Sequence, residues 1–266
     1  MDSPRFLIGR RALVTGSVGG LGLGMAQALA RAGADVMLTG LERAAEVEAT
    51  RAALAAECGV DVRYRRADLG RLEEIEALVE AARSELGGVE ILVNNAVVRH
   101  FAPIEQFPVE RWDAAMAVNV SAAFHAIRLA LPAMRAGGYG RVVNMVSVYG
   151  ERGVAQRIDY VTSKAALRGM TRAVAMELVD GDVTCHALCP GSTLTPALDR
   201  RVVEIMERDG LSRREAETKF LAGKQPNGRF VEIDSVCRAL LLLCGPAGID
   251  MNGAVLPIEG GWLASP

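Results

Sequence analysis

The sequence predicts a single α/β domain with a doubly wound, mostly seven-stranded parallel sheet and helices on both faces. Short apolar segments alternate with longer helix-like segments along the chain. The short segments are continuously apolar, which is typical of parallel strands that are buried on both faces. No long linker, internal repeat or low-complexity tract interrupts the 266 residues, so residues 1–266 are expected to form one domain.

The expected strands are the short apolar runs, at residues 11–15, 35–39, 60–65, 91–93, 141–147, 183–189 and 254–258. Glycine and proline mark the ends of several helices between them. Gly33 closes the first helix, Pro108 stands in the first turn of the fourth, and Gly137 stops that helix. The expected helices lie at residues 21–32, 42–57, 72–86, 108–134, 160–179 and 231–244.

One segment, residues 192–228, departs from this alternation. It is charged, has helix-like patterns at residues 197–207 and 213–221, and follows the carboxyl end of the sixth strand. Open α/β sheets bind their ligands outside the carboxyl ends of the strands. The segment is therefore predicted to form a helical lid over a substrate.

The composition limits the expected partners and location. A net charge of −2 gives no electrostatic reason to expect nucleic acid or an anionic membrane as a partner. No apolar stretch reads as long enough to cross a bilayer, and residues 1–11 lack the apolar run of a signal peptide, so a cytoplasmic location is expected. The five cysteines have no zinc-ligand spacing, which predicts reduced thiols and no metal site.

A glycine-rich turn, TGSVGGLG at residues 15–22, joins the first strand to the first helix. Glycines let a backbone approach a pyrophosphate, and a helix N-terminus offers free N–H groups. The strand before and the helix after are the context that this motif requires, so we predict a dinucleotide site. The second strand ends in TGLER, residues 39–43, without an aspartate to bind the ribose. Glu42 in this stretch offers a carboxylate, which favours NAD, whereas Arg43 could contact a 2′-phosphate, so NAD and NADP both stay open.

Four polar residues are candidates for catalysis. Tyr160 and Lys164 lie four residues apart at the start of a predicted helix, so they share one face. A nearby ammonium favours the phenolate form of a tyrosine, which suits it to acid–base chemistry. Ser147 ends the fifth strand, where a hydroxyl can polarise a substrate carbonyl. Asn119 lies inside a long predicted helix, where asparagine is a mediocre residue, so we expect a role beyond packing.

The order and spacing of these four residues resemble the catalytic tetrad of the short-chain dehydrogenase/reductase family. The resemblance covers the whole chain and implies a Rossmann-type fold, a nicotinamide cofactor and hydride transfer at a secondary alcohol or ketone. It implies that Tyr160 transfers the hydroxyl proton and that Lys164 assists it and grips the nicotinamide ribose. It also implies that Ser147 stabilises the oxyanion and that Asn119 holds a relay water. One departure is Val97, where the family usually has glycine.

The same resemblance implies a set of cofactor contacts spread over the chain. They include the glycine-rich turn, an acidic residue after the third strand, and a Pro-Gly segment with a threonine that holds the nicotinamide carboxamide. The implied cofactor residues are Gly16, Ser17, Gly20, Leu21, Gly22, Leu41, Asp68, Leu69, Asn95, Ala96, Tyr160, Lys164, Pro190, Gly191, Thr193 and Thr195.

Within this family the chain resembles the bacterial D-3-hydroxybutyrate dehydrogenases, at residues 40–47, 94–108, 224–226 and 260–262. Those enzymes use NAD and hold a substrate carboxylate in a polar cluster. The resemblance therefore implies NAD and a small acidic hydroxy or oxo substrate such as 3-hydroxybutyrate. The implied substrate residues are Arg99, His100, Ser147, Tyr149, Arg157, Gln225 and Trp262, of which Arg99, Tyr149 and Arg157 differ in type from the residues of those enzymes.

Some alternatives stay open at this point. Arginine can bind a carboxylate through two hydrogen bonds, so Arg99 and Arg157 favour an anionic substrate. However, Arg99 could face solvent, and Arg157 could pair with Asp159 or Glu151. An NADPH-dependent 3-oxoacyl thioester reductase and a nucleotide-binding protein without catalysis are the alternative functions. Because the family commonly forms tetramers through the helices near residues 112–134 and 160–179, a homotetramer is implied.

Overall fold

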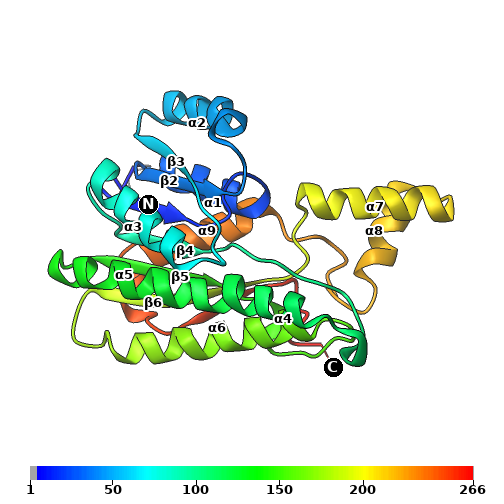
Figure 1. Ribbon diagram of the computed structural model, residues 1–266. Coiled ribbons are helices and arrows are strands. Elements are labelled where there is room, and N and C mark those ends of the chain that lie inside the picture. The colour runs from blue at the N-terminus through cyan, green and yellow to red at the C-terminus, as the bar shows by residue number, and fades with distance from the viewer. Residues whose placement is uncertain (1–4, 266) are drawn as a thin grey trace.

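The computed structural model describes residues 5–265, and it confirms the predicted doubly wound sheet (Figure 1). The strands lie in the order β3-β2-β1-β4-β5-β6-β7, and every neighbouring pair is parallel. They are β1 (Arg11–Val14), β2 (Asp35–Gly40), β3 (Val62–Arg66), β4 (Ile91–Asn94), β5 (Gly140–Met145), β6 (Val183–Pro190) and β7 (Val255–Ile258). The strand order reverses between β1 and β4, and doubly wound sheets bind ligands at the carboxyl ends of such a pair.

Helices cover both faces of the sheet (Figure 1). They are α1 (Gly20–Arg31), α2 (Ala44–Cys58), α3 (Leu72–Leu86), α4 (Val109–Met116), α5 (Ala122–Ala136), α6 (Ile158–Met176), α9 (Ile233–Cys244) and the short α10 (Ala247–Asp250). Successive side chains of a strand point to opposite faces. In β1, Ala12 and Val14 join the apolar cluster that contains α1 and α9, whereas Leu13 joins the cluster that contains α3 and α5. Burial of apolar side chains on both faces therefore holds the layers together.

The long helix expected at residues 108–134 is not continuous. α4 ends at Met116, a wider π-helical turn follows at Ala117–Ser121, and α5 begins at Ala122. A π turn widens one helical turn and leaves the apolar spacing on either side intact, so the sequence pattern does not reveal it. Such turns are frequent at functional sites, and this one contains Asn119.

The same segment corrects the expectation that no apolar stretch reaches membrane length. Val109–Ala136 is long and apolar enough to cross a bilayer by length and composition alone. In this fold its residues Ala126, Ile127 and Ala130 are buried in the apolar cluster that α5 shares with α3 and the sheet. The segment therefore packs as a core helix of an α/β domain.

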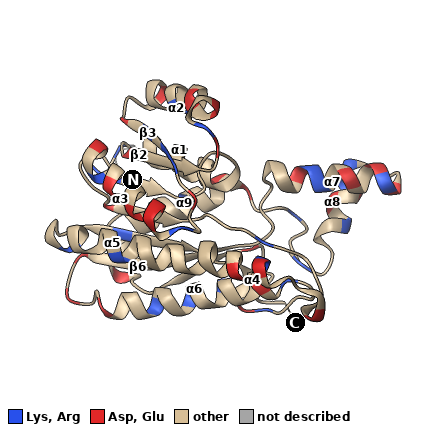
Figure 2. Cartoon of the chain, in the orientation of Figure 1, with Lys and Arg blue, Asp and Glu red and all other residues tan. Residues whose placement is uncertain are grey.

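The predicted lid segment forms two helices, α7 (Pro196–Asp209) and α8 (Arg213–Leu221), which project from the sheet (Figure 1). The side chain of Thr195 caps α7 at the point where the chain leaves β6. A bridge between Thr193 and Val231 fastens the two ends of the segment to each other. Charged side chains of both signs are distributed along these two helices (Figure 2).

Candidate active site

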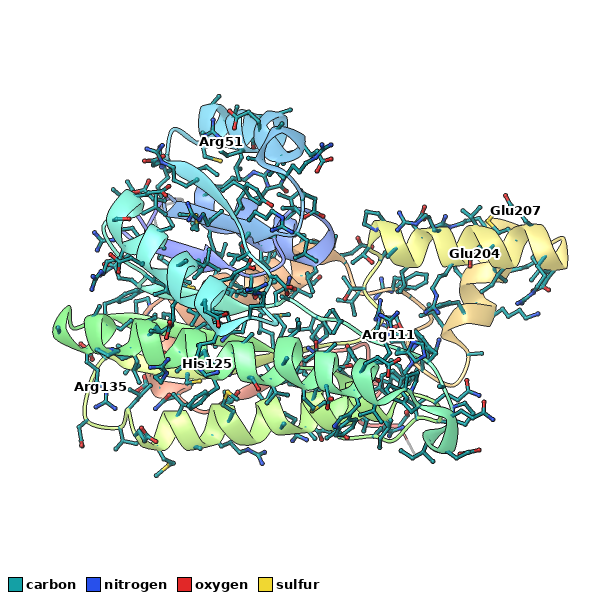
Figure 3. All side chains as sticks on the ribbon, in the orientation of Figure 1. Arg51, Arg111, His125, Arg135, Glu204 and Glu207 are labelled. Atoms are coloured by element: carbon teal, nitrogen blue, oxygen red, sulfur yellow. The ribbon has the colours of Figure 1, made fainter. Side chains whose placement is uncertain are left out.

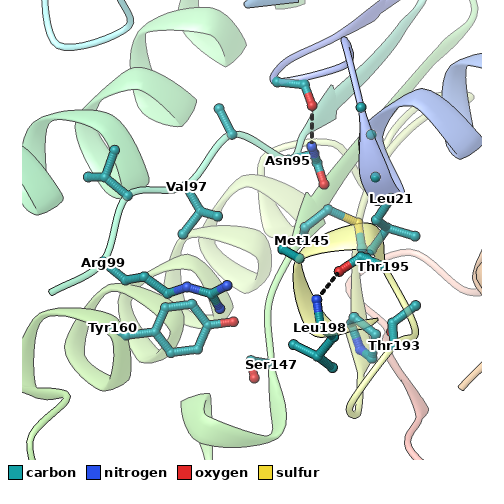
Figure 4. Close-up of a pocket in the computed structure, with 18 of the residues that line it drawn as sticks. Leu21, Asn95, Val97, Arg99, Met145, Ser147, Tyr160, Thr193, Thr195 and Leu198 are labelled. Atoms are coloured by element: carbon teal, nitrogen blue, oxygen red, sulfur yellow. Dashed lines mark hydrogen bonds between the residues drawn. The ribbon is translucent and has the colours of Figure 1, made fainter. Parts of the chain in front are cut away.

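A cavity of about 870 Å³ lies at the carboxyl edge of the sheet and extends under the lid. The chain contributes to its lining from residues at or just after the ends of six strands, from the start of α6, from the lid and from Trp262. Figure 4 shows part of this lining, with Arg99, Tyr160 and Ser147 on one side of the view and Leu21, Thr193 and Thr195 on the other. The cavity therefore joins the predicted cofactor turn to the predicted catalytic residues.

The glycine-rich turn fits a dinucleotide pyrophosphate. No side chain caps α1, so the N–H groups of its first turn are left for a ligand, and Gly20, Leu21 and Gly22 of that turn line the cavity. A methyl group on Gly22 would collide with the carbonyl oxygen of Gly16. The Asn95 amide donates to that same carbonyl at 3.0 Å, which fastens the turn to the end of β4. The shape of the glycine-rich turn therefore depends on close backbone packing that only glycine permits at this position.

The adenosine end of the cavity carries a carboxylate that the strand pattern alone did not place. The Glu42 carboxylate folds back over Gly40 at the end of β2, so closely that a methyl group on Gly40 would collide with it. Glu42 and Asp68 both line the cavity. Arg43 does not line it, because its exposed guanidinium pairs with Glu46 at 2.8 Å. A carboxylate therefore lies in the cavity at the end of β2.

Tyr160 and Lys164 lie on one face of α6, and both line the cavity. The Lys164 ammonium is buried, donates to the carbonyl oxygen of Met145 at 2.6 Å, and lies 5.5 Å from the centroid of the Tyr160 ring. Burial, and then the nearby Arg99 guanidinium, lower the pKa of Lys164 to about 8. This ammonium can therefore release a proton close to neutral pH.

Ser147 lies just beyond β5 at the floor of the cavity. Its Oγ accepts a hydrogen bond from the Tyr149 N–H at 3.3 Å, which leaves the hydroxyl proton to donate elsewhere. The side chain is largely buried and lines the cavity beside Tyr160. It is therefore placed to donate to a substrate oxygen.

Asn119 holds a loop of the cavity in place. Its Oδ1 accepts from the Val98 N–H and its Nδ2 donates to the Val98 carbonyl oxygen, both at 2.8 Å. Its Nδ2 also lies 3.2 Å from the Ser163 hydroxyl. With the amide engaged in this way, a relay water on Asn119 would have to use the main-chain carbonyl, which stays a prediction.

The substrate end of the cavity is aromatic and cationic. The Tyr149 ring packs edge-on against Trp262, with centroids 5.3 Å apart. The Arg157 guanidinium stacks over Phe101 at 4.3 Å. Neither proposed ion-pair partner of Arg157 is available to it. Asp159 accepts from the backbone N–H groups of His100 and Tyr160, and Glu151 pairs with Arg168 at 3.0 Å.

Residues 10–204 match the short chain dehydrogenase family. The chain belongs to this family. It is 40% identical to D-beta-hydroxybutyrate dehydrogenase from Cupriavidus necator over 97% of this chain and 99% of that protein. It is 33% identical to D-beta-hydroxybutyrate dehydrogenase from Rhizobium meliloti over 96% of this chain and 99% of that protein.

The fold of this dehydrogenase is also close to a solved structure. L-sorbose reductase from Gluconobacter frateurii, complexed with NADPH and L-sorbose, has a TM-score of 0.92 at 26% identity, with 99% of this chain and 100% of that chain covered. The protein is therefore an oxidoreductase that acts on CH–OH groups, and its family binds a nicotinamide cofactor.

Most of the residues predicted for this dehydrogenase line the cavity, and four of them, Asn119 described above and the three that follow, do not. Ser17 is fully buried, and its hydroxyl accepts from the Thr39 N–H. The His100 ring packs edge-on against Phe107. Gln225 is buried, with its oxygen bonded to the Ser192 N–H and its nitrogen to the Arg229 carbonyl oxygen just after the lid. The side chain of Gln225 therefore holds the base of the lid and has no free group for a substrate.

Sequence reasoning missed several lid residues of this dehydrogenase that line the cavity. They include Arg200, Arg201, Phe220 and Lys224. By contrast, Glu204 and Glu207 extend from α7 without lining it (Figure 3). One signal was available for two of the missed residues. Arg200 and Arg201 follow the N-cap residue Thr195 in the first part of α7, close to where the chain leaves the sheet.

The pKa of Lys164 leads to a prediction about pH. Its ammonium is present below about pH 8 and is lost as the pH rises through that value. Replacing Arg99 with glutamine removes a charge that repels the Lys164 ammonium, so the pKa of Lys164 should rise. The high-pH limb of the profile of kcat/KM against pH should then move to higher pH. Arg111→Gln, on α4 outside the lining, is the control and should leave that limb in place. An unchanged or lowered limb in Arg99→Gln would contradict this coupling.

Proposed function

We propose that this protein oxidises the secondary hydroxyl of a small hydroxy acid with NAD, and reduces the corresponding oxo acid in reverse. The observation that carries the proposal is an Arg157 guanidinium that has no ion-pair partner among residues 5–265 and lies at the substrate end of the cavity that contains Ser147, Tyr160 and Lys164. The 40% identity to D-beta-hydroxybutyrate dehydrogenase supports the same substrate class.

Each residue of the site has a role in this reaction. A nicotinamide bound in the cavity supplies the hydride acceptor or donor. Tyr160 takes the proton of the substrate alcohol as the phenolate, and as the phenol it returns the proton to the ketone. Ser147 donates its free hydroxyl proton to the substrate oxygen and stabilises the charge that develops there. Lys164 carries the positive charge beside the phenol, and Asn119 fixes the Val98 loop against α6.

A substrate screen tests this proposal directly. Purified protein is incubated with 3-hydroxybutyrate, with neutral secondary alcohols of similar size and with a 3-hydroxyacyl thioester, each with NAD and with NADP. Reduction of the cofactor is followed by its absorbance. We expect the hydroxy acid with NAD to give the highest kcat/KM. Turnover confined to the thioester with NADP would overturn the proposal in favour of a 3-oxoacyl thioester reductase.

We propose NAD as the cofactor because the Glu42 carboxylate lies over Gly40, where it would repel a 2′-phosphate. Glu42→Ala is expected to weaken the preference for NAD over NADP by about tenfold, a change of about 1.4 kcal/mol in transition-state binding. The kcat/KM ratio for the two cofactors measures it. Arg43→Ala is the control, since Arg43 is paired with Glu46 outside the cavity. A wild-type preference for NADP that Arg43→Ala removes would assign the selectivity to Arg43.

We also propose a homotetramer that forms through α4, α5 and α6. Phe124 on α5 and Met176 at the end of α6 are 51% and 71% exposed, although both are large apolar side chains. His125, labelled on α5 in Figure 3, has a buried ring nitrogen without a hydrogen-bond partner among residues 5–265. Light scattering at micromolar concentration should show a tetramer, and Phe124→Glu should shift it to smaller species. A wild-type monomer would refute the assembly.

A further inference from the structure

Four cations converge on the substrate end of the cavity from two sides. Arg99 and Arg157 come from the body of the domain, whereas Arg201 and Lys224 come from the lid. The guanidinium of Arg201 lies 5.3 Å from the centroid of the Phe101 ring, on which Arg157 also stacks. One exposed aromatic ring is therefore flanked by an arginine of the body and an arginine of the lid.

None of these four cations has a carboxylate partner within residues 5–265. The carboxylates that line the cavity, Glu42 and Asp68, both belong to its adenosine end. Lys224 donates one hydrogen bond to the carbonyl oxygen of Phe220 at 2.7 Å and has two more protons to donate. The substrate end therefore has positive charge without a negative counterpart.

Other cations of the lid do have carboxylate partners. Arg213 pairs with Asp199 at 2.6 Å, and Lys219 pairs with Asp209 at 3.0 Å. These pairs lie on α7 and α8, outside the cavity lining. Some outer charges of the lid are thus paired, whereas none of the four cavity cations has an ion-pair partner within residues 5–265.

The cations in the cavity also disfavour one another. Burial lowers the pKa of Lys224, and the charges of Arg157 and Arg201 lower it further. Burial likewise lowers the pKa of Arg157, to which Arg99 and Arg201 add. A ligand with negative charge would relieve this repulsion, and two acidic groups would offset more of it than one.

We infer that the substrate is a dianionic hydroxy acid, whose second acidic group binds between Arg157 of the body and Arg201 and Lys224 of the lid. This inference rests on the proposed function and names its substrate class. The second group is a carboxylate or a phosphate, since both accept several hydrogen bonds from arginine and lysine. Its binding would draw the lid onto the body, because it replaces repulsion between the two by attraction to a shared anion.

The test compares substrates that differ by one charge. 3-Hydroxybutyrate has one carboxylate, 3-hydroxyglutarate has two, and the monomethyl ester of 3-hydroxyglutarate matches the size of the diacid with one charge. A fourth substrate, 3-hydroxybutyrate phosphorylated on an added 4-hydroxyl, carries up to three negative charges and identifies a phosphate as the second group. We expect a substrate with a second acidic group to exceed both monoanions in kcat/KM by about 10- to 100-fold, which is the effect expected of added charge-assisted hydrogen bonds.

Two lid variants locate the effect. Arg201→Ala and Lys224→Ala should each remove most of the advantage of the dianion over the ester. Arg214→Ala is the matched control, since Arg214 is an exposed arginine of α8 that does not line the cavity, and it should keep the advantage. Equal kcat/KM for diacid and ester in the wild type, or equal losses on both in Arg201→Ala, would overturn the inference.

A binding measurement separates this inference from the proposed reaction. Glutarate and butyrate lack the reacting hydroxyl, so calorimetric titration gives their affinities without chemistry. Tighter binding of glutarate that depends on Arg201 supports the dianion site even if the screen finds no oxidised hydroxy acid, in which case only the proposed function fails. Oxidation of 3-hydroxybutyrate together with equal affinities for glutarate and butyrate would leave the proposed function standing and reject the dianion site.

Discussion

Replacing Tyr160 with phenylalanine is expected to lower kcat by about 100-fold or more, since a positioned acid–base group typically contributes roughly 10²–10⁴-fold. The substitution removes only the hydroxyl, and the ring can still pack edge-on against Tyr149. Cofactor affinity should therefore change little. Cofactor absorbance measures the rate, and quenching of protein fluorescence measures the affinity.

Tyr139→Phe is the matched control for this experiment. The Tyr139 hydroxyl donates to the carbonyl oxygen of Cys244 at 2.9 Å and lies outside the cavity lining. Its loss should lower the free energy of unfolding by about 1 kcal/mol, the usual contribution of one hydrogen bond, and leave kcat in place. Near-normal turnover in Tyr160→Phe would assign the proton transfer to another group. Absence of turnover in the wild type, with the cofactor bound, would favour a nucleotide-binding protein without catalysis.

Replacing Arg157 with alanine is expected to lower kcat/KM for a hydroxy acid by about 10- to 100-fold, because a charge-assisted hydrogen bond contributes roughly 1.5–3 kcal/mol. A small substrate makes few other contacts, so its carboxylate carries much of the binding. A neutral ketone of similar size should be affected little. Steady-state kinetics on the two substrates, run side by side, measure the difference.

Arg172→Ala is the control for Arg157→Ala, because Arg172 is an exposed arginine on the same helix and does not line the cavity. It should leave both substrates unaffected. Arg157 also packs on Phe101, so its removal could loosen the loop that carries that ring. A loosened loop would slow both substrates alike, and equal losses would therefore reject a carboxylate contact.

The sequence was sufficient to predict the layers of this fold. The strands are buried on both faces, so their apolar runs are unbroken, and the predicted runs overlap each observed strand to within a few residues. The lid was predictable because its charged helical pattern interrupts that alternation. The glycine-rich turn was predictable because a strand before it and a helix after it define its setting.

Other features depend on contacts between distant parts of the chain and left no local signal. Gln225 is an amide in a lid, and only the fold shows that Ser192 and a carbonyl just after the lid engage it. Arg201 and Lys224 look in sequence like any solvent-facing charges of an amphipathic helix. Glu42 lies two residues after β2, and only its side-chain direction brings it over Gly40.

The π turn at Ala117–Ser121 makes this helix sensitive to length as well as to composition. Deleting one residue there would allow a regular α-helix, and everything beyond it would rotate by about 100° relative to α4. The backbone would remain helical by circular dichroism. However, Ala126, Ile127 and Ala130 would turn away from the sheet, or Asn119 would lose the Val98 loop. The π turn thus fixes the rotational register of α5 relative to α4. A single-residue deletion in it is therefore expected to do more harm than most substitutions.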